Sequence, residues 1–135
     1  MPIELVVVTP QGEAFRGPVD SIVLPGSEGQ FEVLENHERF LSPLHIGVAE
    51  VKTAEGSSFA ALASGFADVS GEQVAVLVES CEIASEIDRA WAELEHDRAK
   101  EGLAGVDADE NRERYERYEE ALRLAEARLA ALEKT

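Results

Sequence analysis

Residues 73–90 read QVAVLVESCEIASEIDRA, and the spacing of the apolar residues changes inside this stretch. Three valines alternate with other residues up to Val78, as in a half-buried strand. Beyond Ser85 the apolar residues recur every three to four positions, which is typical of amphipathic helices. Strands that are followed by helices, and do not alternate with them, indicate two separate layers or domains. We therefore predict a β-domain over residues 1–82 and a helical domain over residues 83–135.

Short apolar segments, many of them β-branched, occupy the chain before this boundary. Gly, Pro and Ser residues separate them at intervals of about ten residues, which is typical of an antiparallel sandwich or barrel. The predicted strands are residues 3–8, 13–15, 19–24, 30–34, 45–51, 58–63, 66–69 and 73–79. Residues 35–43 read as a long loop. Turns this rich in Gly and Pro favour antiparallel pairing, because parallel strands need long crossover connections.

The first predicted helix begins near Ser85. Ser85 and Asp88 have the spacing of a capping box, in which two side chains satisfy free backbone N–H groups of the first turn. Gly102 and Gly105 are predicted to end this helix. The residues predicted to form its apolar face are Ile87, Ala90, Trp91 and Leu94.

A second helix is predicted to follow the start signal Asp107-Ala108-Asp109. Its apolar residues come at alternating steps of three and four, like the a and d positions of a coiled coil. This seam consists of Tyr115, Tyr118, Leu122, Ala125, Leu129 and Leu132. Each helix has one narrow apolar stripe, so we expect a helical hairpin that docks on the β-domain or on a partner. So small a stripe allows docked and extended states that differ by only a few kcal/mol.

The chain has 135 residues and is strongly acidic, with a formal net charge of −16. Nucleic acids and anionic lipid surfaces attract Lys and Arg, so this charge argues against both as direct partners. No apolar run approaches the roughly 20 residues that a membrane span requires, so we expect no membrane insertion. The strand pattern begins directly after Met1, without the pattern of a secretory leader. We expect a cytosolic or membrane-peripheral protein.

No group of residues has catalytic or metal-binding spacing. His37, His45 and His96 form no helical pair and no His-Glu-x-x-His pattern, so no metal site is predicted. The glycines do not form a phosphate-binding loop that opens a helix. The single cysteine, Cys81, excludes an internal disulfide and is expected to be a buried, inert thiol. The sequence predicts an interaction or regulatory protein and no enzyme.

Residues 24–44 read LPGSEGQFEVLENHERFLSPL, and this segment resembles the epsilon subunit of bacterial F-type ATP synthases. It carries a Pro-Gly-x-x-Gly-x-Phe pattern and a later His that are typical of this family. SGFADV at residues 64–69 and the strand-to-helix junction at residues 74–90 are similar to the family in the same order. The resemblance runs over essentially the whole chain. It implies an N-terminal antiparallel β-sandwich of about ten strands, followed by a C-terminal antiparallel two-helix hairpin.

The resemblance implies a non-catalytic rotor subunit of the central stalk, at the cytoplasmic side of the bacterial plasma membrane. The sandwich would bind the gamma subunit and the c-ring of a proton-translocating motor. The hairpin would fold against the sandwich or extend along gamma towards the alpha and beta subunits, where it inhibits ATP hydrolysis. The basic residues of the second helix that would meet acidic surfaces there are Arg112, Arg114, Arg117, Arg123 and Arg128.

The resemblance also implies which residues meet these partners. The candidates for contact with the c-ring are Glu28, Gly29, Gln30 and His37. The candidates for the gamma interface are Phe40, Leu41 and Leu44, which alternatively close one end of the sandwich core. The chain departs from the family at Glu32, where Gly is usual, and at Glu35-Asn36, which stand in place of a Pro-Gly type of turn. The loop that faces the rotor is therefore expected to have a different shape.

Some members of the family bind ATP through the motif Ile/Leu-Asp-x-x-Arg-Ala. The positions that match this nucleotide site are Glu82, Ile87, Asp88, Ala92 and Arg98. Trp91 stands in place of the motif Arg, and Arg89 lies about 200° away around a helix. Losing a guanidinium removes a partner for phosphate, so no cofactor is predicted. We expect Trp91 to pack between the hairpin and the sandwich.

Two other interpretations stay open. In one, the chain is a nucleotide-sensing module whose sandwich and hairpin clamp ATP, which requires Asp88 and Arg98 to converge without the missing Arg. In the other, it is a free-standing β-sandwich enzyme or scaffold that is unrelated to rotary motors and does not associate with gamma.

Overall fold

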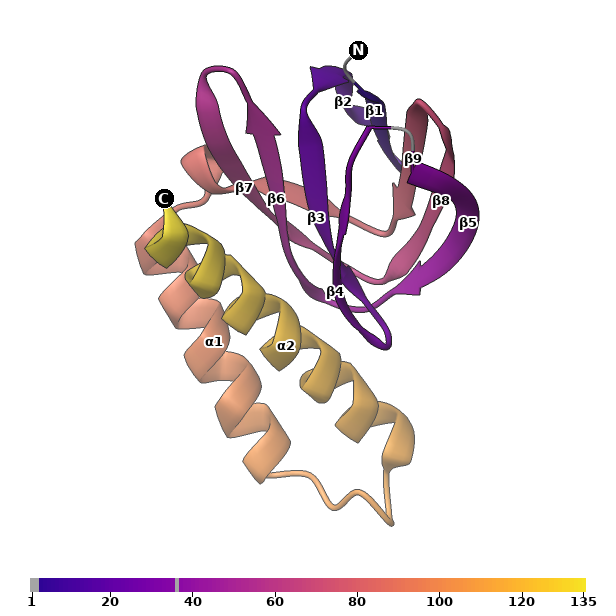
Figure 1. The fold of residues 1–135 in the computed structure, drawn as a ribbon. Helices are drawn as coiled ribbons and strands as arrows, with labels where there is room; N and C mark the ends of the chain where they lie inside the picture. The colour runs from indigo at the N-terminus through magenta and orange to yellow at the C-terminus, as the bar shows by residue number, and fades with distance from the viewer. Residues whose placement is uncertain (1–2, 36) are drawn as a thin grey trace.

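The structure is a computed structural model that describes residues 3–35 and 37–135 and, of His37, only the backbone. Within these residues, ten strands form a β-sandwich and a helical hairpin follows it (Figure 1). The strands are β1 Ile3–Thr9, β2 Gly12–Val19, β3 Ser21–Gly26, β4 Gly29–Val33, β5 His37–Leu44, β6 Gly47–Thr53, β7 Gly56–Leu62, β8 Gly65–Gly71, β9 Gln73–Val78 and β10 Cys81–Ile83. The 3₁₀ turn η1 Ala84–Glu86 leads to α1 Arg89–Ala104 and α2 Arg112–Lys134. The predicted fold class is confirmed.

One continuous sheet folds over to make both layers of the sandwich. Its strand order is β10-β7-β6-β3-β5-β8-β9-β1-β2, with β4 paired to β3 beside this path. β3 forms the corner, because it pairs with β6 in one layer and, through Gly26 and Leu44, with β5 in the other. The two ends of the order are β10 and β2, so the sheet is rolled without closing into a barrel. The boundary predicted at residue 82 falls inside β10.

The sheet is mixed, because β1 and β9 run parallel. Val7 lies opposite Val76 in this pair, whereas the neighbouring pairs β1–β2 and β8–β9 are antiparallel. A parallel pair needs a long connection, and here the strands β2 to β8 supply it. This single pair departs from the purely antiparallel arrangement that the turn chemistry predicts.

The prediction of a loop at residues 35–43 is wrong, because most of this segment belongs to β5. The strand pairs with β8, and its register shifts between His37 and Phe40. An irregularity of this kind and Pro43 interrupt the alternation that identifies a strand in the sequence.

The core lies between the two layers and consists of aliphatic side chains. The largest fully buried side chains are Ile3, Leu5, Ile22, Leu24, Leu62, Val19, Val33, Val69, Val74 and Val76. Val74, Val76 and Val78 are all buried, as their alternation predicts. Each fully buried residue of this size contributes roughly 1.5–3 kcal/mol of transfer free energy, so the sandwich does not depend on the helices for a core.

Asp88, and not Ser85, caps the first helix. Ser85 lies in η1, whereas the Asp88 carboxylate accepts a hydrogen bond from the Trp91 backbone N–H at 3.2 Å. The predicted capping box is wrong because the backbone is still extended at Ile87, so that the helix begins later.

The second helix begins at Arg112, with Asn111 as its cap. The Asn111 side chain accepts a hydrogen bond from the Arg114 N–H at 3.2 Å. Asp107 instead accepts bonds from the N–H groups of Asp109 and Glu110, and so orders the preceding turn. The start signal at Asp107 therefore forms a turn four residues before the cap.

The side chains that both helices bury are alanines. The prediction of the apolar face of α1 is therefore wrong. Ala92 and Ala99 are 0% and 4% exposed, whereas Trp91 and Leu94 are 42% and 47% exposed. The buried residues of α2 are Ala125, Ala127 and Ala131. Alanine allows helices to approach closely, but periodicity arguments give most weight to large side chains. Of the seam predicted for α2, Ala125 is fully buried and the other members are half-buried.

Gly102 lies within α1 and does not end it, because the helix continues to Ala104 and Gly105 is its C-cap. A Cβ atom at Gly102 would come within 2.3 Å of the Tyr118 ring on α2. The ring of Tyr118 therefore explains why a glycine stands inside this helix.

We expect Gly102→Ala to destabilise the hairpin. Overpacking costs about 1–3 kcal/mol of stability, and this cost exceeds the roughly 1 kcal/mol that alanine gains over glycine in helix propensity. The net loss, about 1 kcal/mol, is measured as faster hydrogen exchange of the α2 amides. Gly105→Ala is the matched control, because its Cβ would make only ordinary contacts from 3.6 Å. Equal protection in both variants would contradict the role assigned to Tyr118.

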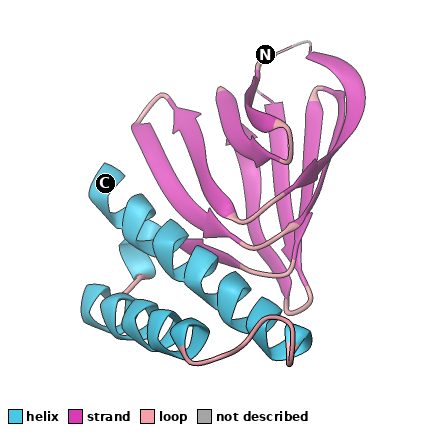
Figure 2. Ribbon diagram, turned by 90° about the horizontal axis from the view of Figure 1, so that it is seen from below, coloured by secondary structure: helices cyan, strands magenta, loops and turns pink. Residues whose placement is uncertain are grey.

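The hairpin docks on the sandwich through its second helix. α2 contacts β6 and β7 and lies between the sheet and α1, as both views show (Figures 1 and 2). Ala61, on β7, is fully buried. The hairpin therefore covers the β6–β7 layer and leaves the outer face of the β5–β8–β9 layer uncovered.

Candidate functional site

The turn between β3 and β4 carries three of the residues predicted to contact the c-ring. Glu28, Gly29 and Gln30 are all exposed there. Gly26 lies opposite Gly29 across the turn, and Gly29 has a φ of 131°, which favours glycine. This tip presents one carboxylate and one amide on a tight, well-defined turn. The fourth candidate, His37, opens β5, but its side chain lies outside the described residues.

Of the three gamma-interface candidates, Leu41 is exposed, Phe40 is half-buried and Leu44 is buried. The Leu41 side chain is 66% exposed, whereas Leu44 is 4% exposed and belongs to the core. Phe40 packs against the core, with its ring 5.4 Å from that of Phe31 in an edge-on arrangement. Phe40 and Leu44 thus close the end of the sandwich, and Leu41 points outwards from the same strand.

Leu41 belongs to an exposed apolar surface that we call the outer-sheet patch, composed of Leu41, Pro43, Phe66 and Leu77. Phe66 is 53% exposed and Leu77 is 48% exposed. Phe66 lies opposite Pro43 on β5 and opposite Leu77 on β9, so the three form one row across the sheet. Large apolar side chains that gather on one face of a soluble protein are typical of an interaction surface.

The prediction omitted three members of the patch, and the sequence contained a signal for two of them, Phe66 and Leu77. Val76 and Val78 alternate with Leu77, so burial of the valines forces Leu77 to the opposite face. The same argument places Phe66 outside, because Ala67 and Val69 are buried. The missing information was which strands are neighbours in the sheet.

An open hollow joins the tip to the outer-sheet patch. Residues 26–31 line one side and residues 40–43 line the other. The tip and Leu41 are therefore parts of one continuous surface at this end of the sandwich. A partner that covers the patch would reach the tip as well.

Glu32, the departure from the usual family Gly, is held by two partners. Its carboxylate accepts a hydrogen bond from the Ser21 hydroxyl at 3.0 Å and lies 2.9 Å from the Lys52 Nζ. The hydrogen bonds from Lys52 and Ser21 lower the pKa of Glu32. This group ties β4 to β3 and β6 across the sheet. Glu32 therefore has a structural role close to the tip.

A cluster of three side chains, which we call the clasp, joins the sandwich to both helices. Arg128 of α2 donates from Nε to both carboxylate oxygens of Glu82 on β10, at 3.0 and 2.9 Å. Its Nη2 lies 2.9 Å from the same carboxylate. The Arg128 guanidinium also stacks 4.4 Å from the centre of the Trp91 ring on α1. The side chains of Arg128 and Glu82 are only 13% and 27% exposed, so water screens this pair weakly.

Comparison with known proteins identifies the family. The family model for the ATP synthase delta/epsilon chain β-sandwich domain matches residues 2–84. An ATP synthase epsilon chain from Syntrophobacter fumaroxidans is 37% identical over 98% of this chain and 97% of its own length. One from Prochloron didemni is 34% identical over 97% and 96%. The chain belongs to the ATP synthase epsilon chain family. Members of this family are non-catalytic stalk subunits of the complex.

Solved structures support the same family. A chain from the Euglena gracilis mitochondrial ATP synthase, described as OSCP/F1/c-ring, matches 97% of this chain and 81% of its own with a TM-score of 0.82 and 25% identity. A chain from the central stalk and c-ring of the Tetrahymena thermophila mitochondrial enzyme shares the fold, with a TM-score of 0.64 and 15% identity. In the described part of this epsilon chain family member, no helix has the length and apolar character of a membrane span.

The residues that match the family nucleotide motif are mostly engaged within the chain. Glu82 binds Arg128, Asp88 caps α1, and Ala92 is fully buried. Ile87 is half-buried in the link before α1. Arg98 lies about 15 Å further along the helix than Asp88 and pairs with Glu95 at 3.4 Å. Trp91 stacks on Arg128 and is 42% exposed, so it contacts the second helix and is not enclosed against the sandwich.

Cys81, on β10, is partly buried and its thiol is held in the neutral form. Burial, with the nearby carboxylates of Glu82 and Glu86, raises the pKa of Cys81 from 9.0 to about 11. At pH 8 the folded chain therefore has roughly 100-fold less thiolate than the unfolded chain.

We expect Cys81 to react with a disulfide reagent about tenfold more slowly in the folded chain than in urea. The lower thiolate population is partly offset by the greater nucleophilicity of a more basic thiolate. The measurement is the labelling rate between pH 7 and 9 in both states. A folded-state rate equal to the unfolded rate would show that the thiol is neither buried nor shifted.

Proposed function

We propose that the chain is a rotor subunit of a proton-translocating F-type ATP synthase that joins gamma to the c-ring. The continuous surface formed by the outer-sheet patch, the hollow and the β3–β4 tip carries this proposal. The apolar patch suits a permanent contact with gamma, because removing such side chains from water stabilises a complex. The polar tip suits the c-ring, whose surface at the membrane edge is expected to be polar.

The helical hairpin is proposed as a regulator of ATP hydrolysis. It docks on the layer opposite the outer-sheet patch, so it would be free to leave while gamma stays bound. The fully buried side chains of α2 are alanines, and its ion pair with the sandwich is the clasp, which supports a small docking free energy. In an extended state its exposed arginines would meet acidic surfaces of the alpha and beta subunits. These arginines are Arg112, Arg114, Arg117 and Arg123.

The proposed location is the cytoplasmic side of the bacterial plasma membrane, where the chain would be peripheral. The similar chains from Syntrophobacter fumaroxidans and Prochloron didemni support a bacterial form. Assembly with the c-ring would hold the chain at the membrane without a span of its own.

Reconstitution of the motor tests the regulatory role. ATP hydrolysis is compared between complexes that contain the full chain and complexes that contain a chain ending at Ser85. A faster rate with the shortened chain supports inhibition by the hairpin. Equal rates at equal occupancy of gamma would remove the regulatory role and leave the role of the sandwich as a link.

A further inference from the structure

The sandwich is open along one side, between its edge strands β2 and β10. Core-facing side chains at this seam are only partly buried, among them Phe15 on β2 and Cys81 on β10. On the far side of the same core, Val69 and Val74 are fully buried. The difference follows from the strand order, because β2 and β10 are the two ends of the sheet. The interior of the sandwich is therefore accessible along this seam.

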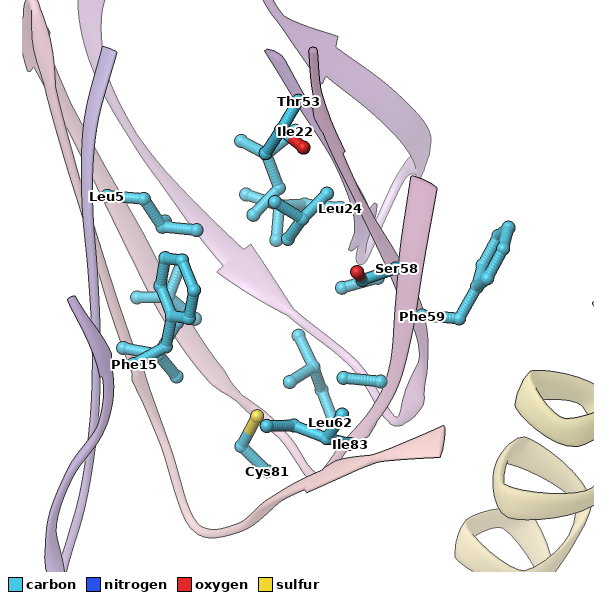
Figure 3. Close-up of a pocket in the computed structure, with 15 residues that line it drawn as sticks. Leu5, Phe15, Ile22, Leu24, Thr53, Ser58, Phe59, Leu62, Cys81 and Ile83 are labelled. Carbon is cyan, nitrogen blue, oxygen red and sulfur yellow. The ribbon is translucent and has the colours of Figure 1, made fainter. Parts of the chain in front are cut away.

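A cavity of about 160 Å³ lies behind the seam. Its wall includes Leu5, Ile22, Leu24 and Leu62, which come from the three strands β1, β3 and β7 (Figure 3). Figure 3 shows the ring of Phe15 and the sulfur of Cys81 facing the same space, whereas the Phe59 side chain points away from it on the other side of its strand. The cavity thus penetrates the apolar core and is not a surface groove.

Small side chains at one level of the sheet produce this cavity. Ala49 on β6 lies opposite Ala60 on β7, and Ala60 lies opposite Ile83 on β10. The wall residue that precedes this row on β7 is Ser58, which is also small. Larger residues at these positions would fill the space between Leu24 and the seam. The void is therefore encoded by particular residues and is not a result of loose packing throughout the core.

The chemistry of the wall excludes polar and charged occupants. No Asp, Glu, Lys, Arg or His is among the described residues that line the cavity. Thr53 and Ser58 carry the hydroxyls of the wall, and the Thr53 hydroxyl already bonds the Gly56 carbonyl at 3.4 Å. A water molecule needs two to four polar partners to be stable inside a protein. The interior of the cavity offers apolar contact almost alone.

We propose that this cavity is a binding site for a small apolar molecule of about the size of benzene. A dry cavity of about 150 Å³ lined by Leu, Ile and Phe is known to bind benzene and xenon, and this one matches it in size and lining. Dispersion contacts with the wall and removal of the ligand from water supply the affinity. The site lies away from the outer-sheet patch, so it is separate from the proposed contact with gamma.

The site also lies beside the clasp. Cys81 and Ile83 line the cavity from β10, and Glu82 between them binds Arg128 on the helical side of the same strand. An occupant would therefore contact the strand that holds the hairpin.

Thermal unfolding of the full chain with benzene tests the proposal. At a benzene concentration about tenfold above the Kd, we expect the melting temperature to rise by about 5 °C. Xenon applied to crystals of the chain is expected to give a density peak between Phe15 and Leu62. No rise with benzene and no xenon peak in the cavity would overturn the proposal.

Two variants, each with leucine in place of an alanine, locate the site. Ala60→Leu fills the cavity from a half-buried position and is expected to abolish the rise in melting temperature. Ala54→Leu is the matched control, because Ala54 lies exposed in the turn after β6 and does not line the cavity, so this variant should keep the full rise. A rise that persists in Ala60→Leu would place benzene elsewhere and overturn the proposal as well.

Discussion

Replacing Arg128 with alanine is expected to weaken docking of the helical hairpin by about 2–3 kcal/mol, a factor of roughly 30 to 150 in the docking equilibrium. The change removes every hydrogen bond between Arg128 and Glu82 and the stacking on Trp91. It also leaves the partly buried carboxylate of Glu82 without its cation. Hydrogen exchange of the α2 amides measures the effect directly, because these amides exchange when the hairpin opens.

The matched control for this variant is Arg123→Ala on the same helix. Arg123 is largely exposed and pairs with Glu119, one turn away, at 3.7 Å. An exposed pair of this kind contributes about 0.3–0.5 kcal/mol, so α2 should keep almost all its protection. Equal exchange rates in the Arg123 and Arg128 variants would show that the clasp does not hold the hairpin.

Two further variants separate the two contacts of Arg128. Glu82→Gln removes the charge pair, and Trp91→Ala removes the stacking, which alone is worth roughly 1 kcal/mol. We expect Glu82→Gln to have the larger effect because it loses the charge of a weakly screened pair. If the hairpin regulates hydrolysis as proposed, Arg128→Ala also increases the extended population and lowers the ATPase rate of the assembled motor.

The division of the chain into strands and helices was predictable because local patterns encode it. Alternation of buried valines up to Val78 and the loss of alternation beyond Ser85 both depend on neighbouring residues alone. The strand β5 was not predictable in this way, since Pro43 and an irregular register hide its alternation. The alanine face of the helices was missed for another reason: Ala92 and Ala99 are buried by close approach of α2, which only the folded hairpin brings about.

The candidate site was predictable only where it is local in the sequence. The tip residues and Leu41 lie in one continuous segment, and the family resemblance named them as candidate contacts. The clasp joins Glu82 to Arg128 across 46 positions, so neither residue points to the other in the sequence. Phe66 and Leu77 meet Pro43 only through the strand order of the rolled sheet. Contacts that depend on topology therefore required the structure.

Phe66→Asp is expected to reduce the affinity for gamma by more than 100-fold. Phe66 lies in the middle of the row formed by Pro43 and Leu77, and a central aromatic residue of an interface contributes about 2 kcal/mol or more. A carboxylate at this position must also lose its water without gaining a partner, which adds to the loss. The measurement is titration calorimetry of the folded variant with purified gamma. A separate denaturation curve first confirms that the variant is folded.

Leu94→Asp is the matched control for this surface. Leu94 is 47% exposed, close to the 53% of Phe66, but it lies on α1 and far from the outer-sheet patch in the fold. A general effect of placing a new carboxylate on an acidic protein would weaken both variants alike, whereas a specific interface affects Phe66→Asp alone. Leu41→Asp should weaken binding as well, since it replaces an exposed apolar side chain of the patch with a carboxylate that must lose its water in the interface. Full affinity in both patch variants would show that gamma binds another face of the sandwich.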